Sequence, residues 1–127
     1  MISRIRIFKY IEKKYGVKPD YPFESDPSLP IFRHRDNRKW FALIMDVDRA
    51  RLGLPGEGSV DIINVKVSDP LLTDILVQQE GYVRAYHMNR RHWISILLDG
   101  TAAFEDICRL IDESFDVTAS KAKRKQL

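Results

Sequence analysis

Three histidines, one cysteine and several carboxylates are the residues of this 127-residue chain that could support metal or covalent chemistry. His87 and His92 flank a short polar stretch, and across a hairpin their Cβ atoms would lie within about 5 Å, close enough to share a metal ion. Zinc also needs a third and usually a fourth ligand. The nearest candidates, His34 and Asp36, belong to a different hairpin, so we expect neither a metal site nor a cofactor.

Nucleophilic catalysis has no visible centre in the sequence. Cys108, the single thiol, falls on the apolar stripe of a predicted helix, where a buried and unreactive thiol is usual. Ser95, Ser114 and Thr73 are scattered, and there is no G-x-S-x-G elbow, phosphate-binding glycine loop or H-E-x-x-H motif. We expect a protein that is not an enzyme.

Basic residues mixed with aromatic ones give the strongest functional signal. They cluster at two predicted hairpins: Arg33, Arg35, Arg38 and Lys39 with Trp40, and then Arg84, Arg90 and Arg91 with Tyr86 and Trp93. Basic hairpin tips that carry aromatic rings can contact phosphates and stack on bases. The alternative is that the tips are charged only for solubility and that both tryptophans lie in the core. A nucleic-acid interface requires the six arginines to form one continuous exposed face.

A protein or peptide partner is the rival interpretation. The proline-rich segment with Tyr21 and Phe23, together with the edges of a small sheet, could receive a partner strand or grip a helix. This interpretation requires an exposed apolar groove or a bare edge strand instead.

Charge and cysteine content limit the class of protein further. The net charge is +3, but residues 121–127 hold four basic residues and no acidic one, so the rest of the chain has a net charge of −1. Residues 1–40 are basic on balance and residues 41–120 acidic, and such local patches, not the total, determine binding to a polyanion. A single cysteine, the lack of a signal peptide and the lack of a membrane-length apolar run lead us to expect a cytoplasmic protein that does not enter membranes.

The elements that must position these residues follow from periodicity and turn signals. We predict three helices. The first covers residues 2–15 and is ended by Gly16; the second begins at Pro70, with Asp69 as its N-cap, and stops at Gly81. The third follows Thr101, which we expect to be its N-cap. The apolar face is Ile5, Phe8, Ile11 and Tyr15 in the first helix, and Leu72, Ile75 and Leu76 in the second. Strands are predicted over 31–35, 39–47, 60–67, 82–87 and 92–98, with loops over 17–30 and 48–59.

The predicted order is helix, three strands, helix, two strands, helix. It gives an α+β fold with one mostly antiparallel five-stranded sheet and packed helices. We expect a single domain over residues 1–118 and a basic, frayed tail over 119–127.

One segment resembles a known family. Tyr86-His87-Met88-Asn89-Arg90-Arg91-His92-Trp93, followed by Leu98-Asp99-Gly100, is similar to the Y-H-M-N-K-x-H-W…L-D-G signature of the MmcQ/YjbR-like proteins. Further matches lie at residues 20–23, 40–43, 64–66 with 69–70, and 110–115, so the resemblance covers roughly residues 1–118. One departure is the stretch 49–58, which is longer and richer in glycine than the short turn expected there.

The resemblance implies the same order of elements, in an architecture similar to type III secretion chaperones. The family has also been called CyaY-like and labelled a DNA-binding "double wing" family. Its motif residues here are Tyr86, His87, Met88, Asn89, His92 and Trp93. We therefore expect a non-catalytic binding protein, a monomer or weak dimer, with DNA as the leading partner and a protein or peptide as the alternative.

Overall fold

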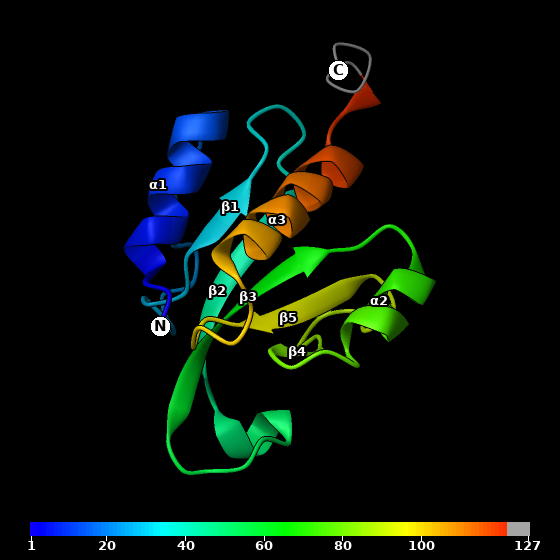
Figure 1. Ribbon diagram of the computed structural model, residues 1–127. Coiled ribbons are helices and arrows are strands. Elements are labelled where there is room, and N and C mark those ends of the chain that lie inside the picture. The colour runs from blue at the N-terminus through cyan, green and yellow to red at the C-terminus, as the bar shows by residue number, and fades with distance from the viewer. Residues whose placement is uncertain (122–127) are drawn as a thin grey trace.

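The computed structural model describes residues 1–121, which form five strands, three α-helices and one 3₁₀ helix (Figure 1). The strands are β1 (Ile31–Arg33), β2 (Trp40–Asp48), β3 (Ser59–Lys66), β4 (Tyr82–Arg84) and β5 (Trp93–Leu97). They form one sheet in the spatial order β1-β2-β3-β5-β4, with every neighbouring pair antiparallel. The fold is α+β, as predicted, and most of the expected tail lies outside the described residues.

Both β-hairpins lie at the same end of the sheet. β2 and β5 each run antiparallel to β3, so they run parallel to one another and both begin beside the end of β3. Lys66, the last residue of β3, pairs with Trp93, the first of β5, while Val65 pairs with Ala42 near the start of β2. The twist of the sheet separates the two hairpins, and in Figure 1 the β1–β2 turn lies at the top while β5 begins on the right.

Two helices, α1 (Arg4–Tyr15) and α3 (Phe104–Thr118), pack on one face of the sheet. The core beneath them contains Phe41, Ile63 and Ile107, all fully buried. β2 is buried on both faces, as its continuous apolar run predicts.

Loops cover the other face. Leu29 comes from the proline-rich segment 17–30, Leu52 and Leu54 from the region of the 3₁₀ helix η1 (Arg49–Leu52), and Tyr86 and Met88 from the segment before β5. They pack on a second apolar cluster that includes buried residues from β2, β3 and β5. This second core explains why the long proline-rich loop is ordered: it covers apolar surface.

α1 ends at Tyr15 as predicted, but it begins at Arg4, two residues later than predicted, and its buried face agrees with the prediction only in part. The Ser3 hydroxyl accepts from the Arg6 N–H, and Gly16 ends the helix in the left-handed region with φ 67°. The fully buried residues are Ile7 and Ile11, whereas Ile5 is 62% exposed. Ile5 lies two positions from Ile7, roughly 200° around the helix, so the two cannot face the same surface.

The other two helices also depart from the prediction at one end. α2 (Pro70–Leu76) begins as predicted, with the Asp69 carboxylate accepting from the Leu71 N–H, but it ends at Leu76, before Gly81. Its Ile75, predicted to face inward, is 59% exposed. α3 begins at Phe104 without a side-chain cap, because the predicted cap, Thr101, belongs to the preceding turn and donates its N–H to Asp99.

A carboxylate joins α1 to α3. Asp112 accepts hydrogen bonds from the hydroxyls of Tyr10 (2.8 Å) and Tyr15 (2.5 Å) and pairs with the Lys14 ammonium at 2.7 Å. Burial, followed by the hydrogen bond to Asp112, raises the pKa of both tyrosines. Cys108, one turn earlier on α3, is buried as expected, and burial raises the pKa of its thiol to about 11.

None of the helices in residues 1–121 is long and apolar enough to cross a membrane.

We predict that Trp93→Ala lowers the free energy of unfolding by about 3–5 kcal/mol, because Trp93 is buried in the loop-covered core. Urea denaturation measures this loss. Trp40→Ala, at the corresponding start of β2 but only half-buried, is the matched control and should cost less. An equal or larger loss for Trp40→Ala would contradict the assignment of Trp93 to the core.

We also predict that the free energy of unfolding falls as the pH rises from about 10 towards 12. The unfolded chain ionises its tyrosines near pH 10, whereas the folded chain keeps Tyr10 and Tyr15 protonated, so alkaline pH favours the unfolded state. Tyr15→Phe should flatten this fall, since phenylalanine does not titrate. Urea titrations at several pH values, with Tyr21→Phe at an exposed position as control, test the idea; identical pH profiles for the two variants would refute it.

Candidate nucleic-acid interface

The two hairpin turns present their cations by the same local geometry. The first turn contains Asn37-Arg38-Lys39 (the first tip), and the second contains Asn89-Arg90-Arg91 (the second tip). In each tip the asparagine Oδ1 accepts from the N–H two residues ahead, at 2.9 Å, an Asx turn. One asparagine-arginine-basic tripeptide therefore occurs twice, at the same end of one sheet.

The first tip is fastened to the end of α3. The Asn37 side-chain amide donates to the Thr118 carbonyl at 2.9 Å. The Thr118 hydroxyl donates to the Ser114 carbonyl at 2.7 Å and lies 2.9 Å from Nε2 of the fully buried His34. The turn closes through the Arg38 N–H, which donates to the His34 carbonyl with Arg38 at φ 63°. His34 is therefore a buried structural residue of this hairpin.

The connection between β4 and β5 is longer than the predicted four-residue turn. It covers residues 85–92, and the second tip lies near its end. The Asn89 carbonyl accepts from the N–H groups of His92 (3.2 Å) and Trp93 (2.9 Å). The Thr73 hydroxyl of α2 donates to the Arg91 carbonyl at 3.2 Å. These bonds hold the backbone, while the side chains of Arg90 and Arg91 stay exposed.

A buried polar cluster fixes the start of this segment. The Asn64 side chain, fully buried on β3, donates to the Tyr86 carbonyl at 3.0 Å and accepts from the Ser95 hydroxyl at 2.5 Å. Ser95 in turn accepts from the Tyr86 N–H at 3.0 Å. Both backbone groups of Tyr86 are thereby satisfied by side chains, which lets the chain leave the sheet just before His87, at φ 60°.

The seven predicted interface cations do not form one continuous face. Arg33 and Arg84 lie on the two outermost strands, at opposite edges of the sheet. Arg33 is bound to Asp20, Arg35 donates to the Gly16 carbonyl, and Arg84 pairs with Asp74 at 2.8 Å. Because Arg33 and Arg84 lie at opposite edges and the Arg33 side chain is only 20% exposed, the requirement for a single exposed face of six arginines is not met.

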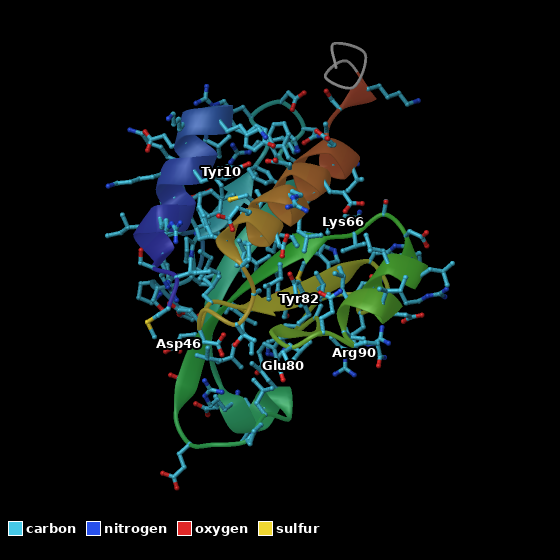
Figure 2. The ribbon with its side chains drawn as sticks, viewed as in Figure 1. Tyr10, Asp46, Lys66, Glu80, Tyr82 and Arg90 are labelled. Carbon is cyan, nitrogen blue, oxygen red and sulfur yellow. The ribbon has the colours of Figure 1, made fainter. Side chains whose placement is uncertain are left out.

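Four of the seven cations remain available, and they are those of the two tips. The Arg38 side chain is 62% exposed and lies 4.0 Å from Asp20. Lys39, Arg90 and Arg91 are exposed and have no carboxylate within 4.0 Å among the described residues. Lys66, which sequence reasoning did not single out, adds a cation at the end of β3 between the tips; Figure 2 labels Lys66 and Arg90 on the same side of the molecule.

Most family-motif residues shape the second tip. Asn89 forms the Asx turn, Met88 packs on the loop-covered core, and Trp93 is buried within it. The centroids of the His87 and Tyr86 rings lie 4.0 Å apart, and the His92 carbonyl accepts from the Val67 N–H at 2.7 Å. No group of three histidine, cysteine or acidic side chains suited to a metal ion occurs within residues 1–121.

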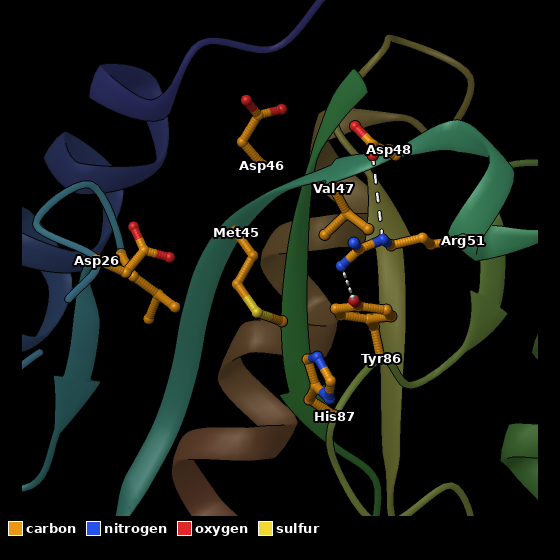
Figure 3. Close-up of a pocket in the computed structure, with 9 residues that line it drawn as sticks. Asp26, Met45, Asp46, Val47, Asp48, Arg51, Tyr86 and His87 are labelled. Atoms are coloured by element: carbon orange, nitrogen blue, oxygen red, sulfur yellow. Dashed lines mark hydrogen bonds and ion pairs between the residues drawn. The ribbon is translucent and has the colours of Figure 1, made fainter. Parts of the chain in front are cut away.

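Two hollows of opposite charge lie on the loop-covered face, and the basic one reaches Arg90 of the second tip. The acidic hollow, about 370 Å³, is lined by Asp26, Asp46 and Asp48 with Arg51, His87 and apolar residues (Figure 3). The basic hollow, about 450 Å³, runs beside β4 and is lined by Arg51, Leu52, Gly53, Val77, Tyr82, Val83, Arg84, Ala85, Tyr86 and Arg90. Arg51 and Tyr86 line both hollows, and the Arg51 guanidinium donates to the Tyr86 hydroxyl at 3.3 Å.

Sequence reasoning missed Arg51, Lys66 and the clip formed by Asn64 and Ser95. The repeated asparagine-arginine-basic tripeptide was visible in the sequence and would have ranked the tip cations above Arg33 and Arg84. Nothing local marks Arg51, because it reaches Tyr86 from 35 residues away.

Together, the fold and this basic end define a small α+β protein with two basic hairpins on one sheet. The YjbR family model matches residues 12–117, and the chain belongs to that family. The uncharacterized protein YyaQ of Bacillus subtilis (strain 168) is 44% identical over 118 residues, which cover 93% of this chain and 99% of YyaQ.

Two solved structures have the same fold. A crystal structure of a Pseudomonas syringae protein from the Northeast Structural Genomics Consortium is 42% identical, has a TM-score of 0.89 and covers 93% of this chain and 100% of that one. The Deinococcus radiodurans protein DR2400, with a DUF419 domain, is 21% identical with a TM-score of 0.73, covering 99% of this chain and 88% of that one. At that identity the likeness shows the fold alone.

We predict that Asn64→Ala releases the segment at Tyr86 and lowers the free energy of unfolding by about 1–3 kcal/mol, since it leaves buried polar groups without partners. Urea denaturation measures the stability, and hydrogen exchange of the Tyr86 amide measures the local release. Gln78→Ala, at an exposed position after α2, is the control. Unchanged protection of the Tyr86 amide in Asn64→Ala would show that the clip does not hold the segment.

Proposed function

We propose that this chain is a non-catalytic nucleic-acid-binding protein whose interface is the basic end of the sheet. The observation that carries the proposal is the repeated Asx turn, which holds Arg38-Lys39 and Arg90-Arg91 outward at the same end of one rigid sheet. Lys66 lies between the two pairs.

The separation of the two tips favours an extended polyanion over a small anion. Duplex nucleic acid carries one negative charge per about 1.7 Å of axis, so it offers phosphates to both tips wherever they meet its backbone. Contacts of this kind position a protein without reading sequence. Two carboxylates of the acidic middle of the chain, Asp46 and Asp48, line a hollow on the loop-covered face, and neither belongs to a tip.

A protein or peptide partner is the second candidate, and one observation favours it. Leu71 and Ile75, one turn apart on α2, are 68% and 59% exposed. Such an apolar pair on a short helix could contact a partner protein. This surface differs from the tips, so variants can separate the two functions.

A salt titration of duplex DNA and RNA binding tests the proposal. Arg38→Ala/Arg90→Ala/Arg91→Ala should reduce the slope of log affinity against log salt by about three units, roughly one for each phosphate that the variant no longer neutralises. Lys9→Ala/Lys13→Ala/Lys18→Ala removes the same charge from α1 and the residues after it, and should keep most of the slope.

A chain ending at Ala119 is the second comparison, because it lacks the basic residues of the C-terminal segment. If the triple tip variant keeps the wild-type slope while the shortened chain loses binding, the tips are not the interface. If the wild type binds neither DNA nor RNA at low salt, the nucleic-acid function is wrong and the apolar pair on α2 becomes the leading site.

A further inference from the structure

The basic hollow continues directly from the second tip. Arg90 lines it, and from there it follows the consecutive residues 82–86 towards η1. Its volume, about 450 Å³, lies within the range of small-ligand sites, about 300–1,000 Å³. A polyanion bound at the second tip would therefore meet this hollow next.

The charge of the hollow selects an anion. Three arginines and no aspartate or glutamate line it, which sets it apart from the acidic hollow on the other side of Arg51 and Tyr86. Arg84 is paired with Asp74 at 2.8 Å, and Arg51 lies 4.0 Å from Asp48, but Arg90 has no such partner among the described residues.

Apolar and aromatic side chains line the hollow together with the arginines. They include Leu52, Val83 and the half-buried Tyr86. Sites for unpaired nucleic acid combine these two features, a basic groove for the backbone and apolar or aromatic surface for the bases. A duplex keeps its bases stacked inside and cannot present one to these side chains, whereas a single strand can.

The edge of β4 is too short to favour a peptide. The Leu97 N–H donates to the Gly81 carbonyl, and because antiparallel bonding alternates, Val83 also faces β5 while Tyr82 and Arg84 face away. The Tyr82 N–H already donates to Gln79. An added strand would gain only the Tyr82 carbonyl and the two backbone groups of Arg84.

We infer that the basic hollow binds single-stranded nucleic acid, with phosphates on Arg51 and Arg90 and a base against Leu52, Val83 and Tyr86. This inference rests on the proposed function and narrows its ligand: the tips hold the backbone, and the hollow takes the unpaired nucleotides beside the second tip.

Salt titrations with a fluorescein-labelled twelve-nucleotide oligo-dT and a twelve-base-pair duplex test the inference on the full chain. Arg51→Gln should reduce the oligo-dT salt slope by about 0.7 unit, the value for one neutralised phosphate of a single strand, and leave the duplex slope unchanged. Val83→Glu, which places a carboxylate in the hollow, should weaken oligo-dT at least tenfold and duplex little. Arg109→Gln on the exposed side of α3 is the matched charge control and should change neither.

The outcomes distinguish the inference from the proposed function. If the duplex binds through the tips but Arg51→Gln and Val83→Glu leave oligo-dT binding unchanged, the hollow is not a single-strand site and the proposed function stands. If neither nucleic acid binds, both are wrong. A third outcome is that a peptide of alternating glutamate and valine binds the wild type and displaces oligo-dT from it, while the Val83→Glu variant does not bind the peptide. In that case the hollow is a peptide site.

Discussion

The pairing of β3 with both β2 and β5 is the constraint on which the rest of the structure depends. β3 pairs with β2 from Ser59 to Val65 and with β5 from Ile62 to Lys66, always antiparallel. Because β2 and β5 must then run the same way, both hairpins come to lie beside Lys66 at one end of the sheet. Two stretches of basic sequence about fifty residues apart thereby become parts of one surface.

Two buried polar clusters fix the segments that pack on the two faces of the sheet. On the loop-covered face, Asn64 and Ser95 satisfy both backbone groups of Tyr86. On the helical face, the Ser114 hydroxyl donates to the Phe41 carbonyl at 2.5 Å and accepts from the Lys66 N–H at 2.8 Å, which ties α3 to β2 and β3. Polar groups in a core are costly when any partner is missing, so each cluster specifies one arrangement of its segment.

The sequence predicted the elements well where the signal is local. Proline, glycine and capping residues placed the loop over 17–30, the end of α1 and the start of α2, and the long apolar run identified β2 as a central strand. Predictions failed where tertiary contacts decide. Ile5 and Ile75 look like core positions but lie on exposed helix faces, and Thr101 serves the turn at Asp99 and not the helix.

The residues of the candidate site likewise fall into those that local sequence marks and those whose role depends on tertiary contacts. The tip cations are marked by local sequence, because an asparagine two residues earlier forms the turn that presents the second cation of each pair. Arg33 and Arg84 look equivalent in sequence, yet each is paired with an aspartate that only the folded chain brings near. Similarly, the motif residues Asn89 and Trp93 suggest function by their spacing, but they build the shape of the second tip.

The most direct test of the two-tip interface is a map of backbone amide chemical shifts of the full chain during titration with a short DNA duplex at low salt. We expect the shifts to concentrate at residues 37–39, around Lys66 and at 89–91, with both tips saturating at the same DNA concentration. Shifts at one tip alone, or centred on α1 or α2 with both tips unmoved, would contradict the claim that the sheet presents two basic tips to one polyanion.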